Sequence, residues 1–295
     1  MKKQLEQLLS NSTHAVYDYE FQKALAAIPW KEWLSVSNYF KCADQYRQTF
    51  DRWIDSSELN SVSGLDRFQR LDIISGTTQS FDEAYFRYKD RHLRIFRGEY
   101  AYHKRVNRDA SFIDDSPLSN NDYIIVSVPF CSTGGIHPRF YQLMEEATIL
   151  KVPVVIDCAY FGTCYNLDID LNFNCIESVS FSLSKGLGLG DNRTGIRYSN
   201  YKDEYPISQQ NDYGHLILGA AKIGLYMMER FSPDHIPKKY KIYQEEVCNL
   251  LDLTPTNCIH LALANHDREN KYLIDGKYHR VGIRDAVKYA SKTKA

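Results

Sequence analysis

The chain has 295 residues, of which 43% are hydrophobic and 25% are charged, and this composition excludes a disordered or collagen-like protein. Its 36 Lys and Arg residues nearly balance 37 Asp and Glu residues, so no basic excess indicates nucleic-acid binding. The mean hydropathy is −0.45, and no apolar run reaches the roughly 18 residues that a membrane span needs, so we expect no membrane partner.

The start of the chain and its cysteines indicate a reducing compartment. Residues 1–13, MKKQLEQLLSNST, carry charged and amide groups where a signal peptide has its apolar core. The seven cysteines show neither a CxxC pair nor zinc-ligand spacing with histidine. We therefore expect reduced thiols, no metal site and a cytoplasmic location.

The pattern of elements changes along the chain. Residues 1–64 are rich in aromatic residues and predict a helical segment that packs on the smaller domain or on a partner subunit. From residue 65, apolar runs and helical periodicity alternate, which predicts an α/β domain over 65–205 with a mostly parallel, mixed sheet flanked by helices. The expected strands are 71–74, 93–96, 123–128, 152–156 and 178–182, and the clearest helix is 140–150. Residues 206–295 predict a connecting helix and a reduced second α+β domain.

Polar residues follow several of these strands, at the sheet edge where ligands bind. Ser75-Gly76-Thr77 come directly before a helix, where backbone N–H groups and hydroxyls form an anion site or, more simply, a helix cap. Asp157 stands at the end of the strand 152–156, where a buried carboxylate needs a partner such as a protonated ring nitrogen. The alternative for Asp157 is a cap of the following turn.

Residues 182–195 form a glycine-rich stretch behind another buried strand. Lys185 enters this stretch and Arg193 stands eight residues later. A desolvated lysine near a cation has a lowered pKa and acts as an amine nucleophile, while arginine binds phosphate with two parallel hydrogen bonds. The stretch contains neither GxxxxGK[ST] nor GxGxxG, which leaves an ordinary surface loop as the alternative.

Taken in order, these segments resemble the fold-type I, pyridoxal-phosphate-dependent enzymes, nearest the class I/II aminotransferases, of which this chain is a short variant. The resemblance covers residues 75–195 and, more weakly, 280–283. It implies a Lys185 Schiff base with the cofactor, Asp157 paired with the pyridinium nitrogen, and Tyr160 donating to the ring 3-hydroxyl oxygen. The other cofactor contacts that it implies are ring stacking by Tyr100 and phosphate binding by Ser75, Gly76, Thr77, Ser182 and Arg193.

Two further positions bear on the resemblance, one at the cofactor ring and one at the substrate. Cys131 replaces the asparagine that the family places near the 3-hydroxyl oxygen, and a thiol is a weak donor. Arg280 fits the family's substrate-carboxylate arginine, with Arg284 as a rival. The resemblance implies a homodimeric aminotransferase acting on an amino acid or amine. Another pyridoxal-phosphate reaction (decarboxylase, lyase or racemase) and a degenerate non-catalytic homologue are the alternatives.

Overall fold

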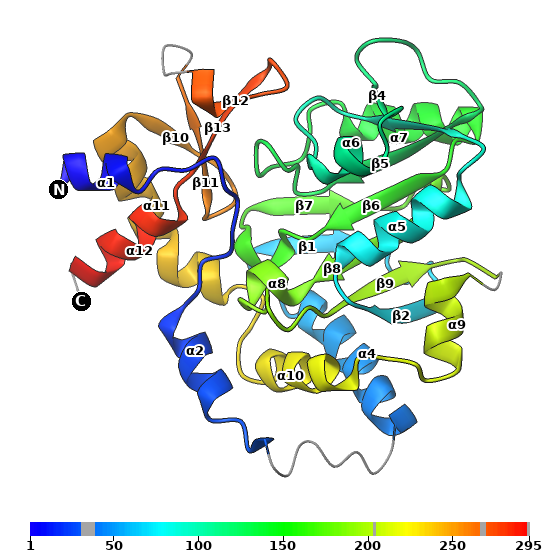
Figure 1. Ribbon diagram of the computed structural model, residues 1–295, viewed down its shortest axis with the longest axis horizontal. Helices are drawn as coiled ribbons and strands as arrows, with labels where there is room; N and C mark the ends of the chain where they lie inside the picture. Colours follow the sequence, from blue (N-terminus) through cyan, green and yellow to red (C-terminus); the bar gives the residue numbers. More distant parts are fainter. Residues whose placement is uncertain (31–38, 203–204, 266–269, 294–295) are drawn as a thin grey trace.

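A seven-stranded sheet forms the centre of the larger part of the molecule (Figure 1). The computed structural model describes residues 1–30, 39–202, 205–265 and 270–293. The strand order is β2 (Arg70–Ile74), β9 (Gly195–Ser199), β8 (Ile176–Ser182), β6 (Val154–Cys158), β5 (Asp122–Ser127), β3 (His92–Ile95) and β4 (Ser111–Phe112). Strand β9 runs antiparallel to both neighbours, and the other pairs are parallel. The predicted mostly parallel sheet is therefore confirmed.

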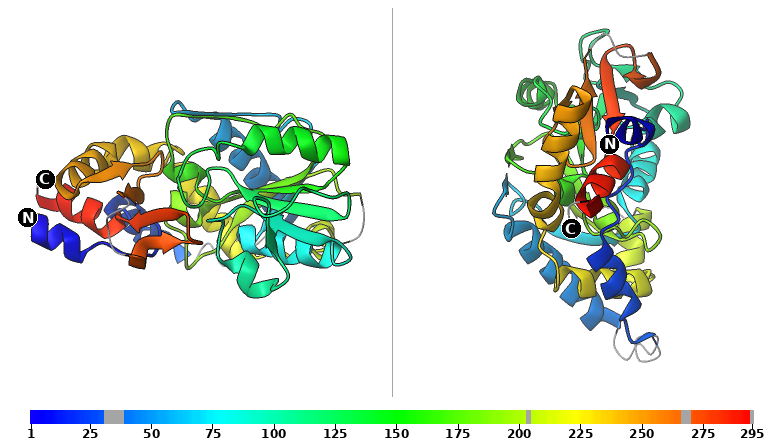
Figure 2. Two further views of the ribbon diagram at one scale, coloured as in Figure 1. Left: turned by 90° about the horizontal axis from the view of Figure 1, so that it is seen from above. Right: turned by 90° about the vertical axis from the view of Figure 1, so that its left-hand side faces the viewer.

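Helices cover both faces of this sheet (Figure 2). They are α4 (Tyr39–Asp55), α5 (Thr77–Arg87), α6 (Tyr102–Val106), α7 (Phe140–Leu150), α9 (Pro206–Asp212) and α10 (Leu218–Met228). Alternate residues of β5 point to opposite faces. Tyr123 and Ile125 join a core with residues of α5, whereas Ile124 and Val126 join the larger core with residues of α4 and α7. Because both faces are covered, β5 is buried along its whole length, which explains its continuous apolar run.

A smaller antiparallel sheet lies beside the first one, in the part where the two ends of the chain meet (Figure 1). Its strands follow the order β10 (Leu253–Pro255), β11 (Leu261–Ala264), β13 (Tyr278–Gly282) and β12 (Leu273–Ile274). Helices α11 (His235–Leu251), α12 (Arg284–Thr293) and α1 (Lys2–Gln7) pack together against it. This arrangement confirms the predicted α+β character of the second part.

The first 64 residues divide between these two parts. Helix α1 packs on α11 and α12, whereas α4 packs on α10 and β2. Between them, the segment 8–18 links α1, on the smaller part, to α2 (Figure 1). The remaining elements are α2 (Tyr19–Ala26), the parallel pair β1 (Asn60–Ser63) and β7 (Leu167–Asp170), α8 (Leu183–Gly186), and the 3-10 turns η1 (Phe161–Thr163) and η2 (Asn270–Tyr272). The boundaries 65–205 and 206–295 stay predictions.

A buried ion-pair network fastens β2, β9 and α5 together. Arg197, 1% exposed, lies 2.7 Å from Asp72 Oδ2 and also donates to Glu83 Oε1. Arg70 Nε binds the other oxygen of Asp72 at 2.8 Å. Removing one partner of such a network leaves an uncompensated buried charge, so the network holds these elements in register. This matters for the site, because the loops after β2 and before β9 carry Ser75 and Arg193.

The described helices are all too short or too polar to traverse a lipid bilayer.

Candidate active site

The carboxyl ends of the central parallel strands meet around one cavity. Asp157 lies near the end of β6, Ser182 ends β8 and Ser127 ends β5. Parallel strands bring these positions to the same edge of the sheet. Eight residues singled out from the sequence line this cavity, namely Thr77, Tyr100, Cys131, Asp157, Tyr160, Ser182, Lys185 and Arg193.

Asp157 is a buried carboxyl, 6% exposed. The backbone N–H of Ala159 donates to its Oδ1 at 2.9 Å, and the Thr77 side chain also hydrogen-bonds to it. Burial, followed by the nearby charge of Glu99, raises the pKa of Asp157 to about 7. Near neutral pH, Asp157 can therefore lose its proton and pair with a cation that enters the cavity.

Lys185 lies on α8, a single helical turn capped by the Ser182 hydroxyl, which accepts from the backbone N–H of Ser184 at 3.2 Å. Its Nζ donates to the Thr13 carbonyl oxygen at 2.7 Å and lies 5.1 Å from the centre of the Tyr160 ring. Burial lowers the pKa of Lys185, and the positive charge of Arg280 lowers it further. A lowered pKa increases the neutral fraction of the amine, which is the nucleophilic form.

Two glycines allow Tyr160 and Lys185 to share the cavity. A Cβ atom on Gly162 would lie 2.6 Å from Gly186 Cα, so any larger residue would force the chain apart. This contact brings η1, which begins just after Tyr160, against α8, which carries Lys185. Tyr160 is itself 5% exposed, and its hydroxyl lies 3.5 Å from Cys131 Sγ.

One end of the cavity is rich in hydrogen-bond donors. Arg193 Nε donates to the Ser75 carbonyl oxygen at 3.1 Å, and its Nη2 donates to Thr78 Oγ1 at 2.7 Å. Gly76 has φ +94°, and a Cβ there would lie 2.6 Å from Arg193 Nη2. The N-terminus of α5, with its free backbone N–H groups, begins at Thr77. Guanidinium, hydroxyl and helix N-terminus together form a site suited to an anion.

Arg280 approaches the cavity from β13 of the smaller sheet. Its Nη1 donates at 3.3 Å both to the carbonyl oxygen and to Sγ of Cys131, which lines the cavity. Its Nε is buried and finds no acceptor among the described residues. Arg284 instead binds both oxygens of Asp285, at 2.9 and 2.7 Å. Of the two arginines considered from the sequence, Arg280 is therefore the one that contacts a residue lining the cavity, although it does not line the cavity itself.

The structure adds residues that the sequence reasoning missed. Thr13, Thr78 and Ser184 also line the cavity. Glu99 is buried beneath it and accepts the backbone N–H of Tyr100 at 3.0 Å. Thr13 contacts Lys185 through its backbone carbonyl, which no side-chain pattern reveals, whereas Glu99 was visible as an acidic residue next to the matched Tyr100.

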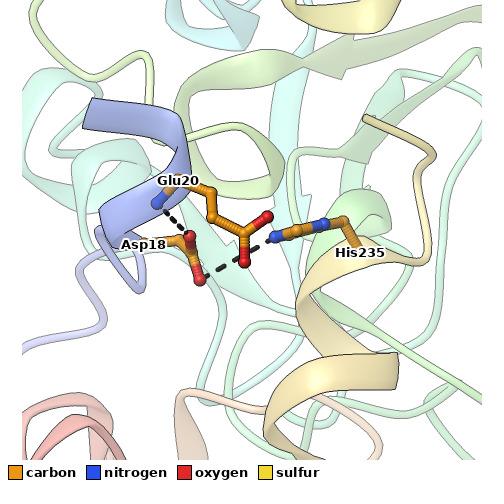
Figure 3. A group of neighbouring side chains, drawn as sticks. All are labelled: Asp18, Glu20 and His235. Carbon is orange, nitrogen blue, oxygen red and sulfur yellow. Dashed lines mark hydrogen bonds and ion pairs between the residues drawn. The ribbon is translucent and has the colours of Figure 1, made fainter. Parts of the chain in front are cut away.

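A separate cluster of possible metal ligands lies where α2 and α11 begin (Figure 3). Asp18, Glu20 and His235 gather there. However, Lys239 Nζ lies 2.8 Å from Asp18 Oδ2 and 2.5 Å from Glu20 Oε1, and the Tyr240 hydroxyl donates to the same Asp18 oxygen at 2.8 Å. An ammonium group thus already pairs with both carboxylates, and we interpret the cluster as an ion-pair network that fastens the N-terminal segment to α11.

No protein-family model matches the chain, and no curated protein matches it in sequence.

Comparison of structures, in contrast, finds the same fold over nearly the whole chain. The histidinol-phosphate aminotransferase from Clostridium acetobutylicum is 14% identical, covers 96% of this chain and 98% of its own, and gives a TM-score of 0.59. The L-threonine-O-3-phosphate decarboxylase from Porphyromonas gingivalis is 12% identical, with 96% and 100% covered and a TM-score of 0.63. An aminotransferase from Staphylococcus aureus is 14% identical, with 92% and 87% covered and a TM-score of 0.59. The chain therefore has the fold of the fold-type I, aminotransferase-like proteins.

Proposed function

We propose that the protein is a pyridoxal-phosphate-dependent aminotransferase that moves an amino group between an amino acid, or a related amine, and an oxo acid. The observation that carries the proposal is the set of groups around one cavity. This set comprises a half-buried lysine amine, a buried carboxyl at a strand end and a donor-rich anion site, contributed by Lys185, Asp157 and Arg193 respectively. A cofactor that combines an aldehyde, a basic ring nitrogen and a phosphate has a partner for each of its groups in this set.

The residues present fit that cofactor. Arg193, Thr78 and Ser182 are suited to hold a phosphate, and glycine at position 76 keeps the guanidinium of Arg193 from being displaced by a Cβ atom. Asp157 is suited to pair with a protonated ring nitrogen, since pairing removes the cost of burying its charge. Tyr100 lines the cavity as an aromatic surface for the ring.

Each protein group then has a defined task. When bound, pyridoxal phosphate supplies an aldehyde that bonds to amines and a ring that withdraws electrons from the substrate carbon. Lys185 would hold the cofactor through Nζ, and the same atom would accept a proton from the substrate α-carbon and return it. Asp157 would keep the ring nitrogen protonated, and Tyr160 would orient the ring through its hydroxyl group. Arg280 binds a substrate carboxylate with the donors that Cys131 leaves free.

The location and assembly of the protein are part of this proposal. The seven cysteines are free in the structure and all are buried, which supports a reducing, cytoplasmic environment. We expect a homodimer, as the resemblance implies, and apolar side chains that stay exposed on the single chain, such as Ile149, Tyr213 and Ile217, are available for such a contact.

A second candidate function keeps the cofactor but changes the bond that is broken. A solved L-threonine-O-3-phosphate decarboxylase shares the fold over its full length, so the fold is compatible with loss of carbon dioxide. Product analysis separates the two: stoichiometric amino transfer to an oxo acid supports the aminotransferase, whereas carbon dioxide, ammonia or a racemised substrate supports a decarboxylase, lyase or racemase. A degenerate, non-catalytic homologue would give none of these products.

The decisive experiment combines covalent trapping with one variant. The protein is incubated with pyridoxal phosphate and reduced with borohydride, and the modified peptide is identified by mass spectrometry. We expect the adduct on Lys185, and neither adduct nor turnover in Lys185→Ala when amino donors and acceptors are screened. Lys185→Arg, which keeps the positive charge but cannot bond to the aldehyde, is the matched control and should be equally inactive. A Lys185→Ala protein that turns over at the wild-type rate would refute the proposal.

A further inference from the structure

Glu99 is a buried carboxyl that the proposed reaction does not use. It follows β3 by four residues, is 3% exposed, and lies between the stacking residue Tyr100 and the end of β5. Burying a carboxylate is costly unless several donors satisfy it. A carboxyl retained so close to the cavity therefore needs a physical reason.

The hydrogen bonds of Glu99 connect three segments of the site. Its Oε1 accepts from the Tyr100 backbone N–H at 3.0 Å and from the Ser127 hydroxyl, and its Oε2 accepts from the Ser127 backbone N–H at 2.9 Å. The Ser127 hydroxyl oxygen in turn accepts from the Cys131 backbone N–H at 2.9 Å. The three partners of the Glu99 carboxyl can all donate and therefore favour its ionised form, whereas burial raises its pKa. One side chain thus fixes the Tyr100 loop and the Cys131 loop to the same strand end.

The same hydrogen bonds bring Glu99 beside Asp157. Ser127 pairs with Asp157 across the parallel strands β5 and β6, and the next residue, Val128, donates its N–H to the Asp157 carbonyl oxygen at 2.8 Å. Glu99 is accordingly a cause, second to burial, of the raised pKa of Asp157. Two buried carboxyls, Glu99 after β3 and Asp157 near the end of β6, therefore flank the end of the intervening strand β5.

Other titratable groups also face this pair. Asp157 is faced by Lys185 from α8, by Tyr100 from the loop after β3 and by Cys158 on its own strand. Glu99 is faced by Arg280 and Tyr278 from β13 and by Cys131 from the loop after β5. Lys185 is the positive group among those facing Asp157, and its own pKa is lowered by burial.

We propose that Glu99 is a positioning residue that acts through Asp157 on the proton balance of the cofactor ring, an inference that rests on the proposed function. When Glu99 is ionised, its negative charge makes Asp157 hold its proton to a higher pH before the ring binds. Once a protonated ring nitrogen is present, the same charge helps Asp157 to keep it protonated.

The test is a pH profile of ring binding in wild type and Glu99→Gln. The probe is 4′-deoxypyridoxine 5′-phosphate, which has the ring and the phosphate but no aldehyde, so its binding does not require a bond to Lys185. Binding of the probe should weaken at low pH as Asp157 becomes protonated, which forms the acidic limb of the profile. Asp157→Asn should lack this limb, and its absence would assign the limb to Asp157. In Glu99→Gln, we expect the midpoint of the limb to fall by about one pH unit, because Asp157 no longer titrates beside a like charge.

Asp234→Asn is the matched control, since Asp234 is equally buried and accepts the same kinds of donor far from the cavity. It accepts from the Ser57 hydroxyl at 2.6 Å and from the backbone N–H groups of Glu58 and Leu59 at 2.6 and 3.3 Å. The midpoint of the acidic limb in Asp234→Asn should equal that in wild type. Glu99→Asp, which keeps a charge, should lie closer to wild type than Glu99→Gln does.

A second measurement needs no variant and decides the matter even if Glu99→Gln does not fold. In cofactor-free wild-type protein with labelled side-chain carboxyl carbons, the resonances of Glu99 and Asp157 should each titrate in two coupled steps. An unchanged midpoint in folded Glu99→Gln, or independent one-step titrations, would overturn the role of Glu99 and leave the proposed function standing. Wild-type protein that binds the probe at no pH would overturn both.

Discussion

Replacing Asp157 with asparagine should stabilise the cofactor-free protein, and by an amount that depends on pH. The folded protein raises the pKa of this carboxyl from 3.8 to about 7, so folding favours its neutral form. Each pH unit between these values is worth about 1.4 kcal/mol. The penalty is therefore absent below the unfolded pKa, grows as the pH rises and reaches about 4 kcal/mol above pH 7.

Asparagine has the shape of aspartate but cannot ionise, so the variant is free of this penalty. Its side-chain oxygen can still accept the Ala159 N–H, and its amide can donate to the Thr77 hydroxyl oxygen. The advantage of Asp157→Asn over wild type should be about 2 kcal/mol at pH 5 and about 4 kcal/mol at pH 8. The same variant should lose affinity for pyridoxal phosphate, because an amide cannot neutralise a ring cation.

The assay is urea unfolding of both cofactor-free proteins at pH 5 and pH 8, followed by circular dichroism. Any direct effect of the amide on packing is the same at both pH values, so only the change in the difference between the two proteins is interpreted. A free-energy difference that stays constant from pH 5 to pH 8 would refute the reasoning, because it would mean that Asp157 titrates in the folded protein as it does in the unfolded chain.

Two further predictions concern the arginines. Arg193→Met should weaken the binding of pyridoxal phosphate about 10- to 100-fold, which is the loss expected for charge-assisted hydrogen bonds. Fluorescence titrations should show that the binding of unphosphorylated pyridoxal is unchanged. Equal losses for both compounds would count against a phosphate site at Arg193. Arg280→Met should raise the KM for an amino acid at least 10-fold but should not change the KM for the corresponding amine without a carboxylate. Arg284→Met should change neither KM, because the Arg284 guanidinium is already bound to Asp285 in the wild type. A larger effect from Arg284→Met would reverse this assignment.

The sequence was sufficient for the parts of the fold and site that depend on buried strands. Apolar runs such as 123–128 mark strands covered on both faces, and in a parallel sheet the residues that follow them, such as Asp157, meet at one edge. Strand β9 was missed because its sequence, GIRYS, places Arg197 at its centre. That arginine is compatible with a buried strand only because Asp72 and Glu83 come to it from distant parts of the chain.

The residues of the site that escaped prediction depend on tertiary contacts rather than on local pattern. Thr13 reaches Lys185 with its backbone carbonyl, and this requires the segment 8–18 to be held against the smaller sheet, where Ser10 and Gly282 exchange backbone hydrogen bonds of 3.0 and 2.7 Å. A Cβ atom on Gly282 would lie 2.0 Å from the Ser12 carbonyl oxygen, so this close approach needs glycine. No periodicity or spacing in the sequence encodes such a crossing of segments.

The way in which charges are buried distinguishes the site from the rest of the molecule. Away from the cavity, buried arginines meet buried carboxylates directly, as Arg197 does with Asp72 at 2.7 Å and Arg94 with Asp122 at 2.8 Å. Around the cavity, two buried carboxyls and two half-buried cationic groups lie near one another: Asp157, Glu99, Lys185 and Arg280. Within the described ranges, no ion pair of 4.0 Å or less joins any of these four. Keeping buried charges apart costs stability unless another charged species completes the pairing. A ligand with a cationic ring and a substrate carboxylate would complete it, which is the physical reason to regard this cavity as the functional site.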